Sequence, residues 1–145
     1  MRRWWLLAIL TILLAAAPRA ALACSCAQAT KAQQAANVAV VFTGTVTNVS
    51  RVFSIGNLCS MSSADPVSVG FQVDSVYKGD LPTTVAVRTA VSGASCGYEF
   101  VAGKRYTVFA TFGDSSLETG LCRGNTEGTI DPTVYGLPAS HPPRT

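Results

Sequence analysis

The pattern of hydrophobic and polar positions predicts a β-rich chain with one short helix. Thr30 is a candidate N-cap, and residues 30–37 are good helix formers that stop before a β-branched run. Residues 38–49 are rich in valine and predict a long strand, in which Gly44 indicates a bulge or a sharp coil. Residues 67–73 alternate between apolar and polar side chains, which is typical of a half-buried strand.

The rest of the chain adds short strands separated by turns. Strands are predicted at 83–90 and 105–112, and a weaker last strand at 117–121. Residues 51–55 could continue the sheet, and a loop rich in Gly, Ser and Asn follows to Pro66. Prolines predict an irregular tail over 129–145. This arrangement favours a small closed barrel, because closure removes exposed strand edges.

Residues 1–23 have the pattern of an export signal. Arg2 and Arg3 precede an apolar run at 4–17, and residues 21–23 have the small-x-small form of a cleavage site. The run is shorter than the roughly 20 residues that cross a bilayer. We therefore expect a mature chain that begins at Cys24, is secreted or periplasmic, and folds in an oxidising compartment.

Charge argues against nucleic acid as a partner. The formal net charge of the 145-residue chain is +3, but three of its arginines lie in the export signal. Residues 24–145 carry eight basic and eight acidic side chains, so their net charge is zero. They therefore lack the excess of basic side chains whose binding to a phosphate backbone would release counterions. The 48% hydrophobic and 13% charged composition excludes disorder and indicates one compact domain.

All five cysteines follow the export signal, which in a small exported domain indicates disulfides. The spacing of Cys24 and Cys26 does not fit a structural zinc site. An odd number leaves at least one cysteine unpaired or modified, and Cys59 could be free or join two chains. A cysteine directly after a leader is also where bacterial lipoproteins are acylated, although Ala21 and Leu22 reverse the usual order of side-chain sizes. Acylation of Cys24 would anchor the protein to a membrane.

Catalytic chemistry and a resident cofactor have little support. His141 is the only histidine and lies among prolines in the tail, so a catalytic pair in the barrel has no base. Asp74, Glu99 and Glu118 are scattered over different strands and are more typical of a solvated surface than of an acid/base pair. Aromatic residues on alternating strands are usually part of the core. They are Phe71, Tyr77, Tyr98, Tyr106 and Phe109.

Several segments, taken in order, resemble the amino-terminal domain of the tissue inhibitors of metalloproteinases and, more broadly, the netrin-like module. They begin with Cys-Ser-Cys at 24–26 and end with Gly-Leu-Cys at 120–122. Between them lie Val-Phe-Thr-Gly-Thr-Val at 41–46, Phe-Gln-Val-Asp-Ser-Val-Tyr-Lys-Gly at 71–79, Ser-Cys-Gly-Tyr at 95–98 and Gly-Lys-Arg-Tyr at 103–106. The resemblance implies a five-stranded barrel of the OB-fold type over 24–128, with disulfides Cys24–Cys96 and Cys26–Cys122.

The resemblance also implies inhibition of a zinc metallopeptidase. Once residues 1–23 are removed, the α-amine and carbonyl oxygen of Cys24 would chelate the zinc of the target, displacing its water. Ser25 would face the adjoining specificity pocket. The contact residues would be Cys24, Ser25, Cys26, Ala94, Ser95 and Gly97. The alternative is a netrin-like module that binds other extracellular or envelope proteins without inhibiting them, anchored by lipid if Cys24 is acylated.

Overall fold

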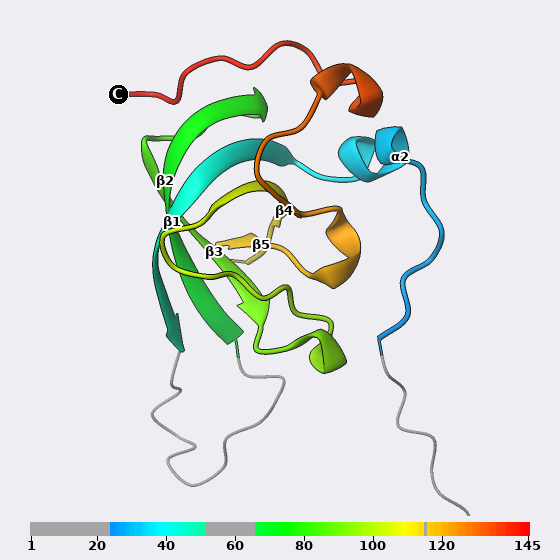
Figure 1. Cartoon of the computed structure of the whole chain (residues 1–145), viewed down its shortest axis with the longest axis vertical. Helices are drawn as coiled ribbons and strands as arrows, with labels where there is room; N and C mark the ends of the chain where they lie inside the picture. Colours follow the sequence, from blue (N-terminus) through cyan, green and yellow to red (C-terminus); the bar gives the residue numbers. More distant parts are fainter. Residues whose placement is uncertain (1–23, 52–65, 115) are drawn as a thin grey trace, which may run out of the picture.

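The computed structural model describes residues 24–51, 66–114 and 116–145 (Figure 1). The predicted export signal, the predicted continuation of the sheet at 52–55, most of the loop that ends at Pro66, and Cys59 lie outside these residues. Within them the chain is mainly β, with one α-helix and several short 3₁₀ turns.

The order of elements follows the predicted order closely. The helix is α2 (Lys31–Ala36), and the long strands are β1 (Val40–Arg51), β2 (Pro66–Lys78), β3 (Thr84–Ala90) and β4 (Arg105–Phe112). Two short strands follow, β5 (Leu117–Glu118) and β6 (Thr126–Glu127). The 3₁₀ turns are η1 (Gly93–Ser95), η2 (Leu121–Arg123) and η3 (Pro132–Tyr135).

Five of the strands form a ring. β1 pairs antiparallel with both β2 and β4, β2 pairs antiparallel with β3, and β5 joins β3 to β4. The ring therefore has the order β1-β2-β3-β5-β4, and β6 pairs with the end of β4 that begins at Arg105. The prediction of a mainly β chain with one short helix is confirmed.

β1 pairs with β2 along one edge and with β4 along the other, and its pairing with β2 is irregular. Its register with β2 shifts between Thr43 and Gly44, so the bulge predicted at Gly44 is confirmed. A Cβ atom at Gly44 would lie 2.6 Å from the carbonyl oxygen of Gln72, which leaves no room for a side chain. β1 pairs with β2 along most of its length and with β4 over Val40 to Thr45.

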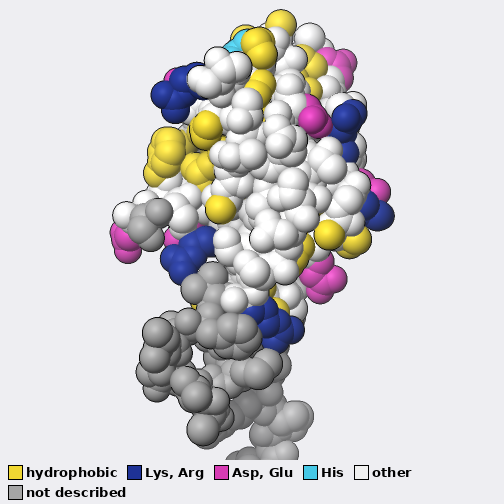
Figure 2. Space-filling view, turned by 90° about the vertical axis from the view of Figure 1, so that its left-hand side faces the viewer, with side chains coloured by type: hydrophobic (Ala, Val, Ile, Leu, Met, Phe, Trp, Pro, Cys, Tyr) yellow, Lys and Arg dark blue, Asp and Glu magenta, His cyan; other side chains and the backbone are white. Residues whose placement is uncertain are grey.

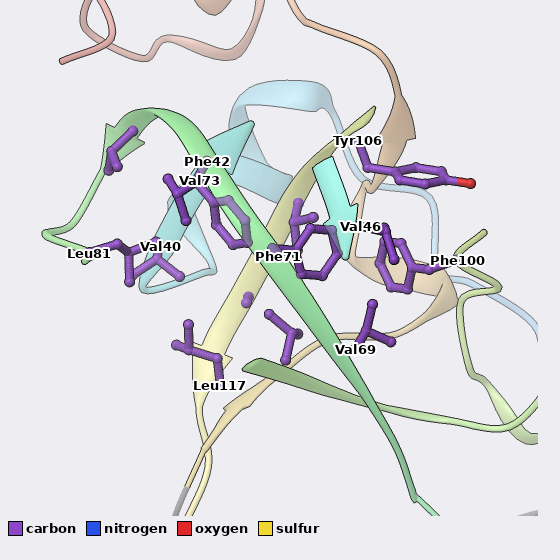
Figure 3. Packing of buried hydrophobic residues seen from close by; sticks show 14 of the residues in the cluster. Val40, Phe42, Val46, Val69, Phe71, Val73, Leu81, Phe100, Tyr106 and Leu117 are labelled. Carbon is purple, nitrogen blue, oxygen red and sulfur yellow. The ribbon is translucent and has the colours of Figure 1, made fainter. Parts of the chain in front are cut away.

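Aromatic and valine side chains fill the inside of the ring (Figure 3). Phe71 contacts Phe42 and Phe100 edge to face, with ring centroids 5.4 and 5.2 Å apart. Tyr106 packs against Phe100 in the same way. The prediction that the aromatic residues belong to the core is confirmed for Phe71, Tyr77, Tyr106 and Phe109, which are all buried, whereas Tyr98 is half-buried.

A second, smaller cluster lies between α2 and the end of the chain. Tyr135 stacks on Phe109 with centroids 5.3 Å apart, and Ala35 of the helix is buried with them. The segment 129–145, predicted as an irregular tail, contains η3 and is held to the sheet by backbone hydrogen bonds between His141 and Val76 of 2.8 and 2.9 Å. Burial of Tyr135 explains why this proline-rich segment packs against the sheet.

The predicted last strand at 117–121 is shorter than expected. β5 ends at Glu118, and the chain then passes through Gly120, whose backbone is fully extended, into η2. β6 was not predicted, because a two-residue strand has no periodicity of its own. Both short strands depend on backbone partners from distant parts of the chain: β5 pairs with β3 and β4, and β6 pairs with β4.

The capping box at the start of α2 gives a testable stability effect. The Gln33 N–H donates to Thr30 Oγ1 at 3.2 Å, and the Thr30 N–H donates to Gln33 Oε1 at 2.9 Å. We expect Thr30→Ala to lower the free energy of unfolding by about 1 kcal/mol, because it removes the cap. Urea unfolding measures this, with Thr30→Ser as the control that keeps the hydroxyl. Equal stability of Thr30→Ala and the unchanged protein would contradict the assignment.

Candidate functional site

Two disulfides hold the segment 24–26 against two separate loops. Cys24 is bonded to Cys96 with Cα atoms 5.3 Å apart, and Cys26 is bonded to Cys122 with Cα atoms 5.2 Å apart. The pairing implied by the resemblance is therefore the pairing in the structure. Because the two bonds are only two residues apart in the sequence, Ser25 between them has little freedom to move, and its side chain is exposed.

The loop that carries Cys96 is a tight turn built around Ser92. The Ser92 carbonyl accepts from the Ser95 N–H at 3.1 Å and from the Gly97 N–H at 2.8 Å. Cys96 itself has φ = 65°, the only positive φ of a residue other than glycine in the described part of the chain. A left-handed conformation at such a residue is costly and persists only where its surroundings fix it. Here the turn and the disulfide to Cys24 fix it together.

The predicted contact residues of this loop lie at different depths. Ala94 is exposed, and Ser95 is half-buried with its hydroxyl donating to the Ser92 carbonyl at 3.0 Å. Gly97 is buried, and a Cβ atom there would lie 1.9 Å from the carbonyl oxygen of Ala90. Gly97 is thus required for close packing of the loop on β3, and Ala94 is the residue that the loop presents outward.

The loop that carries Cys122 touches the loop that carries Cys96. The Leu121 N–H donates to the Cys96 carbonyl at 2.9 Å, and a Cβ atom at Gly120 would lie 2.7 Å from the same oxygen. Leu121 keeps 40% of its surface exposed. Leu121 is not among the site residues predicted from the sequence, although its place directly before Cys122 was a usable signal.

The surroundings of this site are close to neutral. Arg123 is the one charged residue within segments 24–26, 92–97 and 119–123. Tyr98 lies two residues after Cys96, and burial, followed by repulsion from Tyr106 and Glu127, raises the pKa of its hydroxyl. Figure 2 shows the left-hand side of the molecule in Figure 1, away from the amino-terminal segment, and there too basic and acidic side chains are interspersed. The ion pairs Lys104–Glu127, Arg105–Asp74 and Arg144–Asp80 fit that distribution.

Other candidates from the sequence are placed apart from the disulfides. His141 is exposed in the last segment, with Nδ1 2.9 Å from the Pro142 carbonyl. Asp74 is on β2 and pairs with Arg105, whereas Glu118 is on β5 and Glu99 follows the Cys96 loop. In segments 24–51, 66–114 and 116–145 no three His, Cys, Asp or Glu side chains are grouped so that they could hold a metal.

No helix in the described part of the chain is long and apolar enough to span a membrane. Comparison of the sequence with protein-family models and with curated proteins found no match.

Proposed function

We propose that this chain is an exported, netrin-like inhibitor of zinc metallopeptidases that resembles the amino-terminal domain of the tissue inhibitors of metalloproteinases. In this proposal the ring β1-β2-β3-β5-β4 is a barrel of the OB-fold type. Residues 1–23 are removed on export, and Cys24 becomes the first residue. The mature protein is then secreted or periplasmic and needs no cofactor of its own.

The observation that carries the proposal is the double tether of segment 24–26. A chain end normally frays, and ordering it during binding costs conformational entropy. Here Cys24 and Cys26 are bonded to loops that also contact each other through Leu121 and Cys96. Since segment 24–26 is already ordered in the folded protein, binding a partner costs little further conformational entropy, and the segment can bind as a rigid wedge.

The first residue of such a wedge can act as a bidentate zinc ligand. A free α-amine is partly neutral near pH 7, and its lone pair is then available to a metal. The Cys24 nitrogen and carbonyl oxygen would close a five-membered ring on the zinc of the target. A catalytic zinc has three protein ligands and an open position that holds water, so the chelate would displace the nucleophile of the peptidase.

Exposed side chains next to Cys24 would contact the cleft on both sides of the zinc. Ser25 is small and exposed, which suits a specificity pocket beside the metal, and Ala94 is exposed on the loop bonded to Cys24. Cys26, Ser95 and Gly97 would act mainly by holding these residues in place, since Ser95 and Gly97 are engaged with Ser92.

The Cys24–Cys96 disulfide argues against the alternative in which Cys24 is acylated as in a lipoprotein. Acylation of a lipoprotein cysteine forms a thioether at its sulfur, and that sulfur cannot at the same time be bonded to a second cysteine. The Cys24–Cys96 bond therefore favours a chain that is free of a lipid anchor. A netrin-like module that binds proteins without inhibiting them is the alternative that an assay must separate from the inhibitor.

The test is an inhibition assay with the processed protein. Mass spectrometry first establishes that the secreted chain begins at Cys24 with both disulfides formed. We then expect it to inhibit at least one member of a panel of zinc metalloendopeptidases, with competition by a small hydroxamate that binds the same zinc. A correctly processed and oxidised protein that inhibits none of the panel would leave the binding module as the better function.

A further inference from the structure

The loop that carries Cys122 is itself held to β4 by a pair of side chains, one on each side of Cys122 in the sequence. On the edge of β4 that does not pair with β1, β6 pairs with Tyr106 and Thr107, and β5 pairs with Thr111 and Phe112. Phe109 lies between the two short strands and is fully buried, so its backbone groups need partners there.

Asn125 and Thr119 supply those partners. The Phe109 N–H donates to Asn125 Oδ1 at 2.8 Å, and the Phe109 carbonyl accepts from Thr119 Oγ1 at 2.6 Å. The two side chains thus occupy the place of a missing strand residue between β5 and β6. Unlike a strand, they are attached to the two ends of one loop, residues 119–125, which contains η2 and Cys122.

The same side chains also close that loop on itself. Asn125 Nδ2 donates to Thr119 Oγ1 at 2.8 Å and to the Gly120 carbonyl at 3.1 Å. The Gly120 carbonyl belongs to the same peptide group as the Leu121 N–H, which donates to the Cys96 carbonyl. A continuous set of hydrogen bonds therefore runs from the buried strand β4 through Asn125 to both loops that are bonded to segment 24–26.

We propose that Asn125 and Thr119 are positioning residues, which determine the position of Cys24 and Ser25 relative to the ring. The inference rests on the proposed function for its effect on inhibition, but not for its effect on the loop. Within the described residues, the side chain of Asn125 hydrogen-bonds to Phe109, Thr119 and Gly120 and not to segment 24–26. It acts through the position of Cys122 and of the Leu121 N–H that donates to Cys96.

The experiment compares Asn125→Ala with the matched control Asn48→Ala. Asn48 is exposed on β1, and among the described residues its side chain hydrogen-bonds only with the neighbouring Thr47. Mass mapping checks that both disulfides form. Hydrogen exchange then measures the Leu121 amide and segment 24–26, with Val69 in the core as an internal reference. We expect exchange at Leu121 to rise at least about tenfold in Asn125→Ala and to change less than twofold in Asn48→Ala.

A second pair of variants keeps the test decisive if Asn125→Ala folds poorly. Thr119→Ser keeps the hydroxyl and is expected to behave like the unchanged protein, whereas Thr119→Val removes the hydrogen bonds at nearly constant volume and is expected to raise exchange at Leu121. In the inhibition assay, Asn125→Ala and Thr119→Val are expected to raise the inhibition constant at least about tenfold.

The outcomes separate the two proposals. Unchanged exchange at Leu121 and 24–26 in both Asn125→Ala and Thr119→Val overturns the positioning role, whatever the inhibition assay shows. Faster exchange with an unaltered inhibition constant overturns it as well. If the unchanged protein inhibits nothing while exchange rises as expected, the positioning role is supported and only the proposed function fails.

Discussion

One alanine added before Cys24 is expected to weaken inhibition of a zinc metallopeptidase by about a thousandfold or more, which corresponds to about 4 kcal/mol of binding free energy. The extension converts the α-amine of Cys24 into a peptide nitrogen, which has no lone pair available for zinc at neutral pH. It also places a residue where the metal would sit. Because the disulfides fix the position of segment 24–26, this segment cannot shift to make room for the extra residue.

The measurement is the inhibition constant of the extended and the native protein against the same peptidase. A protein with the alanine added after Thr145 is the control, since it has the same composition and an unaltered Cys24. Both proteins should show the same disulfide map and the same unfolding midpoint. Equal inhibition by the two proteins would show that the α-amine of Cys24 is not a zinc ligand.

Removal of the Cys26–Cys122 disulfide is expected to lower the free energy of unfolding by about 4 to 5 kcal/mol. The bond spans 96 residues and the Cys24–Cys96 bond spans 72. In the chain-entropy model the two losses differ by only a few tenths of a kcal/mol, because the entropy depends on the logarithm of the loop length. For a domain with a typical stability of about 5 to 15 kcal/mol, either loss is large.

The double substitution Cys26→Ser with Cys122→Ser tests this by urea unfolding. It is best made in a Cys59→Ser background, so that no fifth cysteine can exchange with the remaining bond. The matched variant is Cys24→Ser with Cys96→Ser in the same background. A loss below about 1 kcal/mol in both variants would mean that the folded ring and not the cross-links restrains the chain. If neither variant folds, the loss is at least as large as the stability of the protein, and the free energy of unfolding of the unchanged protein then sets its lower limit.

Local sequence signals predicted much of the fold because they act over a few residues. The cap at Thr30 and the good helix formers after it specified α2, and the observed N-cap is the predicted one. The alternation after Pro66 specified which face of β2 is buried, since Val67, Val69, Phe71 and Val73 are all in the core. Gly44 marked the bulge in β1 because its backbone is approached closely by β2.

The parts that sequence patterns did not predict depend on contacts between distant residues. β5 and β6 are two residues long and are strands because distant strands pair with them: β3 and β4 pair with β5, and β4 pairs with β6. Tyr135 looked like part of an irregular tail, yet it is buried against Phe109 and α2. Asn125 carries no signal as a single polar residue, because its role comes from Phe109, 16 positions away.

The sequence by itself determined the local elements of this protein: a capped helix, the long strands with their buried faces, and cysteines two residues apart whose pairing followed from the resemblance. Those features follow from backbone preference and from the periodicity of apolar side chains, which neighbouring residues decide. Only the tertiary structure decided how the ring closes, how the last segment packs, and how Asn125 and Thr119 hold the disulfide loops. Each of these depends on burial and hydrogen bonding between residues that meet only after the chain has folded.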